Sequence, residues 1–87
     1  PAKRSTGLRF SKTPAYWRVA SVVPDSPASK AGVQIGDLVS RINGEPITEW
    51  DLRRYEQLLA ETREVTFSFL RGTEETPHTF LVFELVP

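Results

Sequence analysis

Several short stretches of the chain are rich in apolar side chains, either in a continuous run or at alternate positions, as is typical of β-strands. Residues 16–23 and 38–42 are rich in β-branched and aromatic side chains, which favour extended structure. Residues 65–71 form a further stretch, in which Val65 to Phe69 alternate between apolar and polar positions as a half-buried strand does. Residues 78–86 form the last stretch. A shorter alternation at residues 8–10 predicts one more strand near the N-terminus.

Residues 26–32 predict a short helical turn, because residues that begin and end helices stand at its two ends. Ser26 is a suitable N-cap, and Pro27 suits the first helical position. Gly32 suits the left-handed residue that follows a last turn. Farther along the chain, the Asn43-Gly44 pair predicts a tight turn between two extended segments.

A longer helix is predicted over residues 48–61. Thr48 is expected to cap this helix, and Asp51, three residues later, completes an approximate capping box. Apolar side chains then recur at helical spacing along one arc, at Leu52, Tyr55, Leu58 and Leu59. The helix therefore has one apolar face to bury.

The predicted elements follow the order β-β-α-β-α-β-β, which favours the α+β class. We expect a small, partly closed antiparallel β-sandwich or barrel of about five to six strands, with one short and one long helix. A chain of 87 residues suits a single domain, here residues 1–87, in which the polar and basic residues 1–6 are a flexible lead-in. Because the chain lacks an initiating Met and a signal-peptide pattern, we expect a mature or excised part of a longer protein.

The composition argues against several classes of function. The chain has no Cys and one His, so we expect no disulfide framework, no thiol nucleophile and no His-rich metal site. It also lacks a Gly-x-Ser-x-Gly elbow and a His-Glu-x-x-His pair, so we expect no catalytic residues, no metal and no cofactor. No apolar run approaches the roughly 20 residues of a membrane span, so direct membrane insertion is not expected.

Charge is balanced overall but unevenly distributed. The net charge is zero, which argues against binding to nucleic acid. The first 24 residues carry a charge of +5 and the remainder −5. This distribution is typical of a solvated polar surface, or it indicates a local anion-facing region near the N-terminus.

Three motifs together carry a resemblance to a known family. The first is Gly7-Leu8-Arg9-Phe10, and the third is Ile42-Asn43-Gly44 before the long helix. Between them, residues 26–44 have the spacing Ser-Pro-Ala-x-x-Ala-Gly-Val-x-x-Gly-Asp-x-Val-x-x-Ile-Asn-Gly. Over residues 3–86 the chain resembles a PDZ domain, and its strand order is similar to the circularly permuted type found in bacterial proteases.

The resemblance implies a module that binds peptide C-termini and extended apolar segments. In such domains a loop presents successive backbone N–H groups to a terminal carboxylate, and here these would be the amides of Leu8, Arg9 and Phe10. The peptide would add as a strand along residues 10–12, with its side chains toward the helix at residues 49–61. The residues expected to bind peptide are Gly7, Leu8, Arg9, Phe10, Ser11, Lys12, Leu52, Tyr55 and Leu59.

Two registers of the long helix compete for the groove. One register turns Leu52, Glu56 and Leu59 toward it, and the other turns Asp51, Tyr55 and Leu58 toward it. We expect Leu52, Tyr55 and Leu59 to form the groove face. The helix does not begin with the histidine of the family members that prefer Ser or Thr two residues before the terminus, so an apolar preference is expected.

Several further residues have two interpretations. Arg9 stands where the family often has Gly, so it is either a solvated charge or an extra charge near the carboxylate. Lys3 or Arg4 is either a surface charge or the basic residue that the family places before the loop. Asp37 is expected to cap nearby backbone amides. Trp17 and Trp50 are expected to pack in the fold, with Trp50 the more exposed of the two.

The resemblance also implies a larger protein. We expect a covalently linked protease domain and a location in the bacterial cell envelope or periplasm, with this chain as the substrate-recognition or regulatory domain. An alternative is an intramolecular regulator that gates its protease without binding free peptides. A third possibility, which rests on the basic N-terminal segment, is an anionic-surface binding domain.

Overall fold

The computed structural model describes residues 3–13 and 15–85. Their helices and strands are, in chain order, β1 (Lys3–Ser5), β2 (Leu8–Lys12), β3 (Trp17–Val22), α1 (Pro27–Lys30), β4 (Leu38–Ile42), β5 (Glu45–Pro46), the 3-10 helix η1 (Ile47–Glu49), α2 (Leu52–Glu61), β6 (Glu64–Arg71), β7 (Glu74–Leu81) and β8 (Phe83–Leu85).

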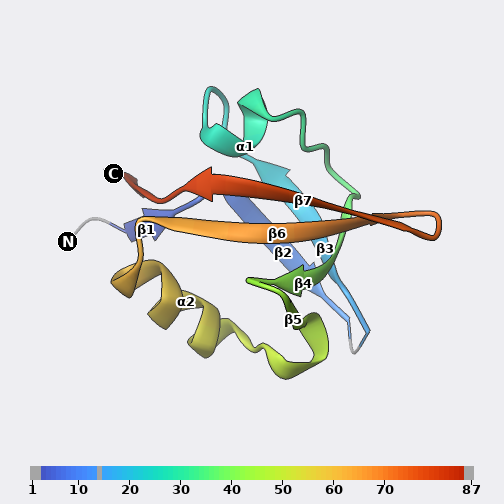
Figure 1. The fold of residues 1–87 in the computed structure, drawn as a ribbon. Coiled ribbons are helices and arrows are strands. Elements are labelled where there is room, and N and C mark those ends of the chain that lie inside the picture. Colours follow the sequence, from blue (N-terminus) through green and yellow to red (C-terminus); the bar gives the residue numbers. More distant parts are fainter. Residues whose placement is uncertain (1–2, 14, 86–87) are drawn as a thin grey trace.

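The strands pair antiparallel in two sheets, and α2 lies beside them (Figure 1). The larger sheet has the order β2-β3-β4-β6-β7, with β5 paired to β4, and β1 pairs with β8. The expected α+β class with one short and one long helix is confirmed. Neither helix in the described ranges has the length and apolar character that crossing a membrane requires.

The turn-forming residues act as their sequence predicts. Ser26 caps α1 by accepting a hydrogen bond at Oγ from the backbone N–H of Ser29 (3.2 Å), and Pro27 is the first helical residue. Asn43 and Gly44 join β4 to β5 with φ values of +50° and +80°. Two successive positive φ values match the twist of antiparallel strands, which is why Asn-Gly pairs favour this turn.

The long helix begins later than expected. Asp51, not Thr48, is its N-cap, and its Oδ1 accepts a hydrogen bond from the backbone N–H of Arg54 (2.7 Å). Before it, Ile47–Glu49 forms the 3-10 turn and Trp50 is extended (φ −110°, ψ 140°). The reason is burial: this bend turns the side chains of both Ile47 and Trp50 into the core.

Two strand assignments also need correction, and both concern contacts between distant parts of the chain. Residues 3–5, expected within a flexible lead-in, form β1, in which Lys3 pairs with Leu85. The connection between the strands expected at residues 65–71 and 78–86 is shorter than these bounds imply, because β7 already begins at Glu74, which pairs with Arg71. Local composition is polar in both segments, so only the partner strand reveals them.

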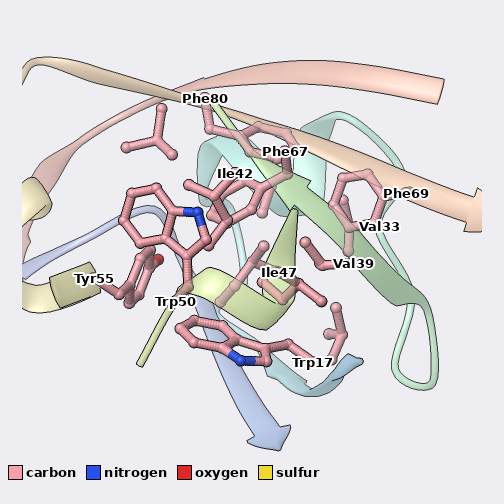
Figure 2. Packing of buried hydrophobic residues seen from close by; sticks show 14 of the residues in the cluster. Trp17, Val33, Val39, Ile42, Ile47, Trp50, Tyr55, Phe67, Phe69 and Phe80 are labelled. Carbon is pink, nitrogen blue, oxygen red and sulfur yellow. The ribbon is translucent and has the colours of Figure 1, made fainter. Parts of the chain in front are cut away.

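The core is built on the inward-facing side chains of β6 and is rich in aromatic rings. Val65, Phe67 and Phe69 alternate along this strand and are all buried, as the sequence predicts. Figure 2 shows Trp50 and Tyr55 packed into the same cluster. Both tryptophans are buried, and Trp50 is the more exposed of the two, as expected, at 8% against 3% for Trp17. The guanidinium of Arg54 lies 3.8 Å from the centre of the Trp50 ring and covers it.

Candidate functional site

A groove of about 530 Å³ lies between α2 and the N-terminal strands. The strands β1, β2 and β8 supply one wall and α2 supplies the other. The lining residues are Lys3, Arg4, Ser5, Leu8, Arg9, Leu52, Tyr55, Glu56, Leu59, Ala60 and Leu85.

The floor of the groove is apolar and its rim is charged. Leu8, Tyr55 and Leu59 are largely buried, so only a small part of each side chain is exposed in the groove. Leu52 stands at the rim with 49% of its surface exposed. Such a surface suits a ligand that places apolar side chains into the groove and keeps its backbone near the rim.

The groove lies beside an open edge of the larger sheet. β2 is the terminal strand of the order β2-β3-β4-β6-β7, so only β3 is hydrogen-bonded to it among the strands of the described ranges. Its other edge faces α2, as Figure 1 shows. The register shifts between Arg9 and Phe10, a bulge of the kind that re-aims strand residues next to binding sites. A terminal strand of this kind can accept one more strand.

Gly7 shapes the turn that leads into β2. Its φ is +94°, and a Cβ atom there would lie 2.3 Å from Oγ and 2.5 Å from Cβ of Ser26. Its N–H donates to Oγ of Ser5 (2.8 Å), and its carbonyl accepts from the N–H of Val23 (2.8 Å). Both the backbone angle and the close approach to α1 require glycine.

Tyr55 forms part of the α2 wall and is held in place from two sides. Its hydroxyl forms a hydrogen bond with Oγ1 of Thr6 (3.1 Å). Its ring packs edge-on against Phe10 and Trp17, with centroids 5.7 and 5.5 Å away. Burial raises the pKa of Tyr55 to about 12, and the hydrogen bond with Thr6 opposes part of that rise. The side chain is therefore a neutral wall at physiological pH.

Arg4 joins β1 to the C-terminal end of α2. Its Nε donates to the carbonyl of Leu59 (2.7 Å), and its Nη2 donates to the carbonyl of Thr62 (2.8 Å). The last carbonyls of a helix lack partners within the helix and carry its negative dipole end. Arg4 satisfies two such groups, so it is neither a plain surface charge nor a free cation.

The structure brings together five of the nine residues expected at the site. Leu8, Arg9, Leu52, Tyr55 and Leu59 all line the groove. On α2 the lining residues are the three of the expected face, together with Glu56 and Ala60. Leu58, in the competing register, lines a separate hollow beside Trp50 on another side of α2.

The other four expected residues do not line the groove. Gly7 forms the turn described above, and Phe10 packs against Trp17 with centroids 5.3 Å apart. Ser11 and Lys12 are exposed on β2. Ser5, Ala60 and Leu85 also line the groove, although they were not expected there. The last strand expected from the sequence, residues 78–86, includes Leu85, but nothing local shows that this part of the chain reaches the groove.

Asp37 and His78 both have roles in the scaffold. Asp37 caps a turn as expected, because its Oδ2 accepts from the backbone N–H of Gln34 (3.0 Å) and from Arg71 (3.2 Å). His78 stacks on Phe80, with ring centroids 6.2 Å apart. Within the described residues, no three His, Cys, Asp or Glu side chains are grouped so that they could hold a metal ion.

The comparisons with known proteins agree with this geometry. The model of the PDZ domain family matches residues 18–79. CPE1693 of Clostridium perfringens, named as a zinc metalloprotease, is 38% identical over 68 residues, which are 78% of this chain and 20% of that protein. A DegP-like periplasmic serine endoprotease of Pseudomonas putida is 50% identical over 34 residues, which are 39% of this chain and 7% of that protein. The chain thus spans a fifth or less of these relatives.

Solved structures share the fold over nearly the whole chain. The PDZ domain of HtrA3, bound to the phage-derived ligand FGRWV, superposes with a TM-score of 0.78 at 22% identity and covers 98% of this chain and 89% of that one. The PDZ domain of a carboxy-terminal protease from Vibrio cholerae, in complex with a peptide, has a TM-score of 0.77 at 18% identity and covers both chains completely.

Proposed function

This chain belongs to the PDZ domain family, and we propose that it captures C-terminal or extended apolar segments of polypeptides by adding them as a strand to β2. A PDZ domain is a non-catalytic binding module, and in the protease relatives the catalytic role lies in another domain. The chain's contribution is therefore recognition, and any chemistry belongs to residues outside it.

The observation that carries the proposal is the open edge of β2 above the groove. A ligand strand on this edge would use its backbone for hydrogen bonds to β2, while every second side chain turns toward α2. Leu8, Tyr55 and Leu59 would receive those side chains, and Leu52 would contact them at the rim. Phe10, Ser11 and Lys12 would contribute mainly backbone groups, since their side chains do not line the groove.

The turn at Gly7 supports recognition of a free C-terminus. The amides of Leu8, Arg9 and Phe10 follow this turn, and successive backbone N–H groups of such a turn suit a carboxylate. The C-terminal end of α2 borders the same end of the groove, and its negative dipole would repel an anion. Arg4 offsets that dipole through its bonds to Leu59 and Thr62, so a carboxylate becomes tolerable there.

The relatives support a protease context for the whole protein. Two solved neighbours are PDZ domains of proteases that hold a peptide ligand, and one curated relative is named as periplasmic. We propose that this domain is covalently linked to a protease domain and recognises that protease's substrates or regulates it. We also propose a location in the bacterial cell envelope.

The test is an amide chemical-shift titration with pentapeptides that end in an apolar residue, each made with a free and an amidated C-terminus. We expect shifts to concentrate at residues 8–12 and along α2. The amidated peptide should bind more weakly by about 1.5 to 3 kcal/mol, because a set of charge-assisted hydrogen bonds is lost.

Three outcomes separate the proposal from its alternatives. Equal affinity for the two peptides would show that the domain recognises internal segments and not a carboxylate. Shifts confined to other surfaces would overturn the site assignment. An absence of binding to any peptide would favour a regulator that contacts only its own protease.

A further inference from the structure

Glu56 stands out among the residues that line the groove. Of the lining side chains, three are basic (Lys3, Arg4 and Arg9) and Glu56 alone is acidic. It is exposed, and no ion pair involves it within the described residues. Its neighbours one turn away on α2 are Leu52, Arg53, Leu59 and Ala60. Only Arg53 is charged, and no ion pair joins it to Glu56 in the part of the chain that the structure describes. Its charge is therefore available to a ligand.

The contacts between the two walls fix how the groove runs. Arg4, which precedes the turn at Gly7, bonds to Leu59 and Thr62 near the C-terminal end of α2. Phe10 of β2 and Trp17, which is paired with Lys12 at the far end of β2, both contact Tyr55, closer to the N-terminal end of α2. Moving from the turn at Gly7 along β2 therefore means moving from the C-terminal end of α2 toward its N-terminal end. The basic side chains of β1 lie at the end where the proposed carboxylate sits, and Glu56 lies about one helical turn away from Leu59.

The side chains on one face of a ligand strand are spaced along it at nearly the distance between successive turns of α2. Alternate residues of a strand are about 6.8 Å apart, and successive turns of a helix are about 5.4 Å apart. A terminal side chain beside Leu8 and Leu59 therefore places the side chain two residues earlier beside Tyr55 and Glu56. The residue in between points away from α2.

We propose that Glu56 selects ligands with a lysine or arginine two residues before an apolar C-terminus. This inference rests on the proposed function and names the ligand class of that groove. It replaces the apolar preference that the sequence led us to expect at the position two residues before the terminus. Tyr55 is neutral and buried, so it offers the aliphatic part of a long basic side chain an apolar surface. The Glu56 carboxylate at the rim then meets the charged end.

The experiment uses four pentapeptides with the same apolar C-terminal residue and a free carboxylate. Three of them differ only at the position two residues before the end, which is Lys, Ala or Glu. The fourth moves the Lys to the position one residue before the end, so that its net charge matches the first. Each peptide is titrated by calorimetry or fluorescence into the wild-type domain and into the Glu56→Gln, Glu56→Lys and Glu61→Gln variants.

Glu61→Gln is the matched control, because Glu61 also lies on α2 but lines the hollow beside Trp50. The wild type should prefer Lys over Ala by about two- to five-fold at low salt, the range of an exposed ion pair, and should disfavour Glu. Glu56→Gln should remove this preference and Glu56→Lys should reverse it. Glu61→Gln should keep it, and the shifted Lys should lose it.

The experiment distinguishes a failure of this inference from a failure of the proposed function. If the peptides bind but the preference for Lys is absent, or persists in Glu56→Gln, this inference is wrong and the proposed function stands. If the shifted Lys is favoured equally, the effect is one of net charge and Glu56 is not selective. If no peptide binds to a folded domain, the proposed function and this inference both fall.

Discussion

The side chain of Arg4 donates a hydrogen bond to the backbone carbonyl of Leu59, 55 residues later in the chain, over a distance of 2.7 Å. Leu59 is also a wall of the groove, so this bond ties the first strand to the helix that a ligand would contact. The Arg4 guanidinium also donates to the carbonyl of Thr62. These two bonds satisfy carbonyls at the end of α2, a role that the turn at a glycine after the helix often fills.

Arg4→Ala should lower the free energy of unfolding by about 1 to 3 kcal/mol, because two carbonyls at the end of α2 lose a charged donor. Chemical denaturation measures this. Arg4→Lys should recover only part of the loss, since an ammonium group does not reproduce the guanidinium's two donor positions. Arg53→Ala is the control: this exposed arginine of the same helix should change stability by less than about 0.5 kcal/mol. Equal losses for Arg4→Ala and Arg53→Ala would contradict the capping role.

Gly7→Ala should destabilise the domain more than Gly36→Ala does. The two glycines have nearly the same φ, +94° and +97°, so both substitutions carry backbone strain of about 1 to 3 kcal/mol. Only at Gly7 would the new Cβ meet Ser26, at 2.3 Å from Oγ, whereas at Gly36 nothing lies within 4 Å. The difference in unfolding free energy therefore measures the contact with α1.

A double-mutant cycle tests whether the extra cost of Gly7→Ala comes from the contact with Ser26. In the Ser26→Gly background the close contact is gone, so Gly7→Ala should cost less there than in the wild type. Ser26→Gly by itself removes the N-cap of α1 and gives the baseline. An identical cost of Gly7→Ala in both backgrounds would mean that the strain lies in the turn alone.

Leu59→Ala and Leu58→Ala should separate binding from stability. Leu59 is buried and lines the groove, so its truncation should cost about 2 to 5 kcal/mol of stability and also weaken peptide binding. Leu58 is only partly buried and faces the hollow beside Trp50, so its truncation should leave peptide affinity unchanged. Affinity is measured at a temperature where circular dichroism shows both variants folded. Weaker binding in Leu58→Ala alone would reverse the assignment of the helix face.

The raised pKa of Tyr55 predicts a loss of stability in alkali. Below pH 10 the phenol is protonated in both the folded and the unfolded state, so it adds no pH dependence. Between pH 10 and about 12 the unfolded state releases this proton and the folded state keeps it. The free energy of unfolding should therefore fall as pH rises through this window, by up to about 1.4 kcal/mol per pH unit.

Tyr55→Phe provides the comparison, because it removes the titrating group and keeps the ring. The stability difference between wild type and Tyr55→Phe should be constant below pH 10 and should shift in favour of the variant above it. Denaturation midpoints measured across the range check this. A difference that stays constant up to pH 12 would show that the Tyr55 hydroxyl is not protected from ionisation.

Much of this protein follows from local sequence. Ser26 and Pro27 begin α1, and Asn43-Gly44 turns β4 into β5, because each depends on a backbone conformation that the residue itself favours. The alternation of Val65, Phe67 and Phe69 likewise reports which face of β6 is buried. Such features need no partner to be recognisable.

The features that required the tertiary structure depend on partners far away in the chain. Lys3–Ser5 has no strand pattern of its own and becomes β1 only because β8 pairs with it. The helix begins after Trp50 because burying that ring bends the chain, which overrides the cap that Thr48 offers locally. Leu58 and Leu59 share one apolar arc, yet only the packing of α2 against β1 and β2 decides which of them lines the groove. Helical spacing reports that a face is apolar, but what covers that face is a property of the assembled fold.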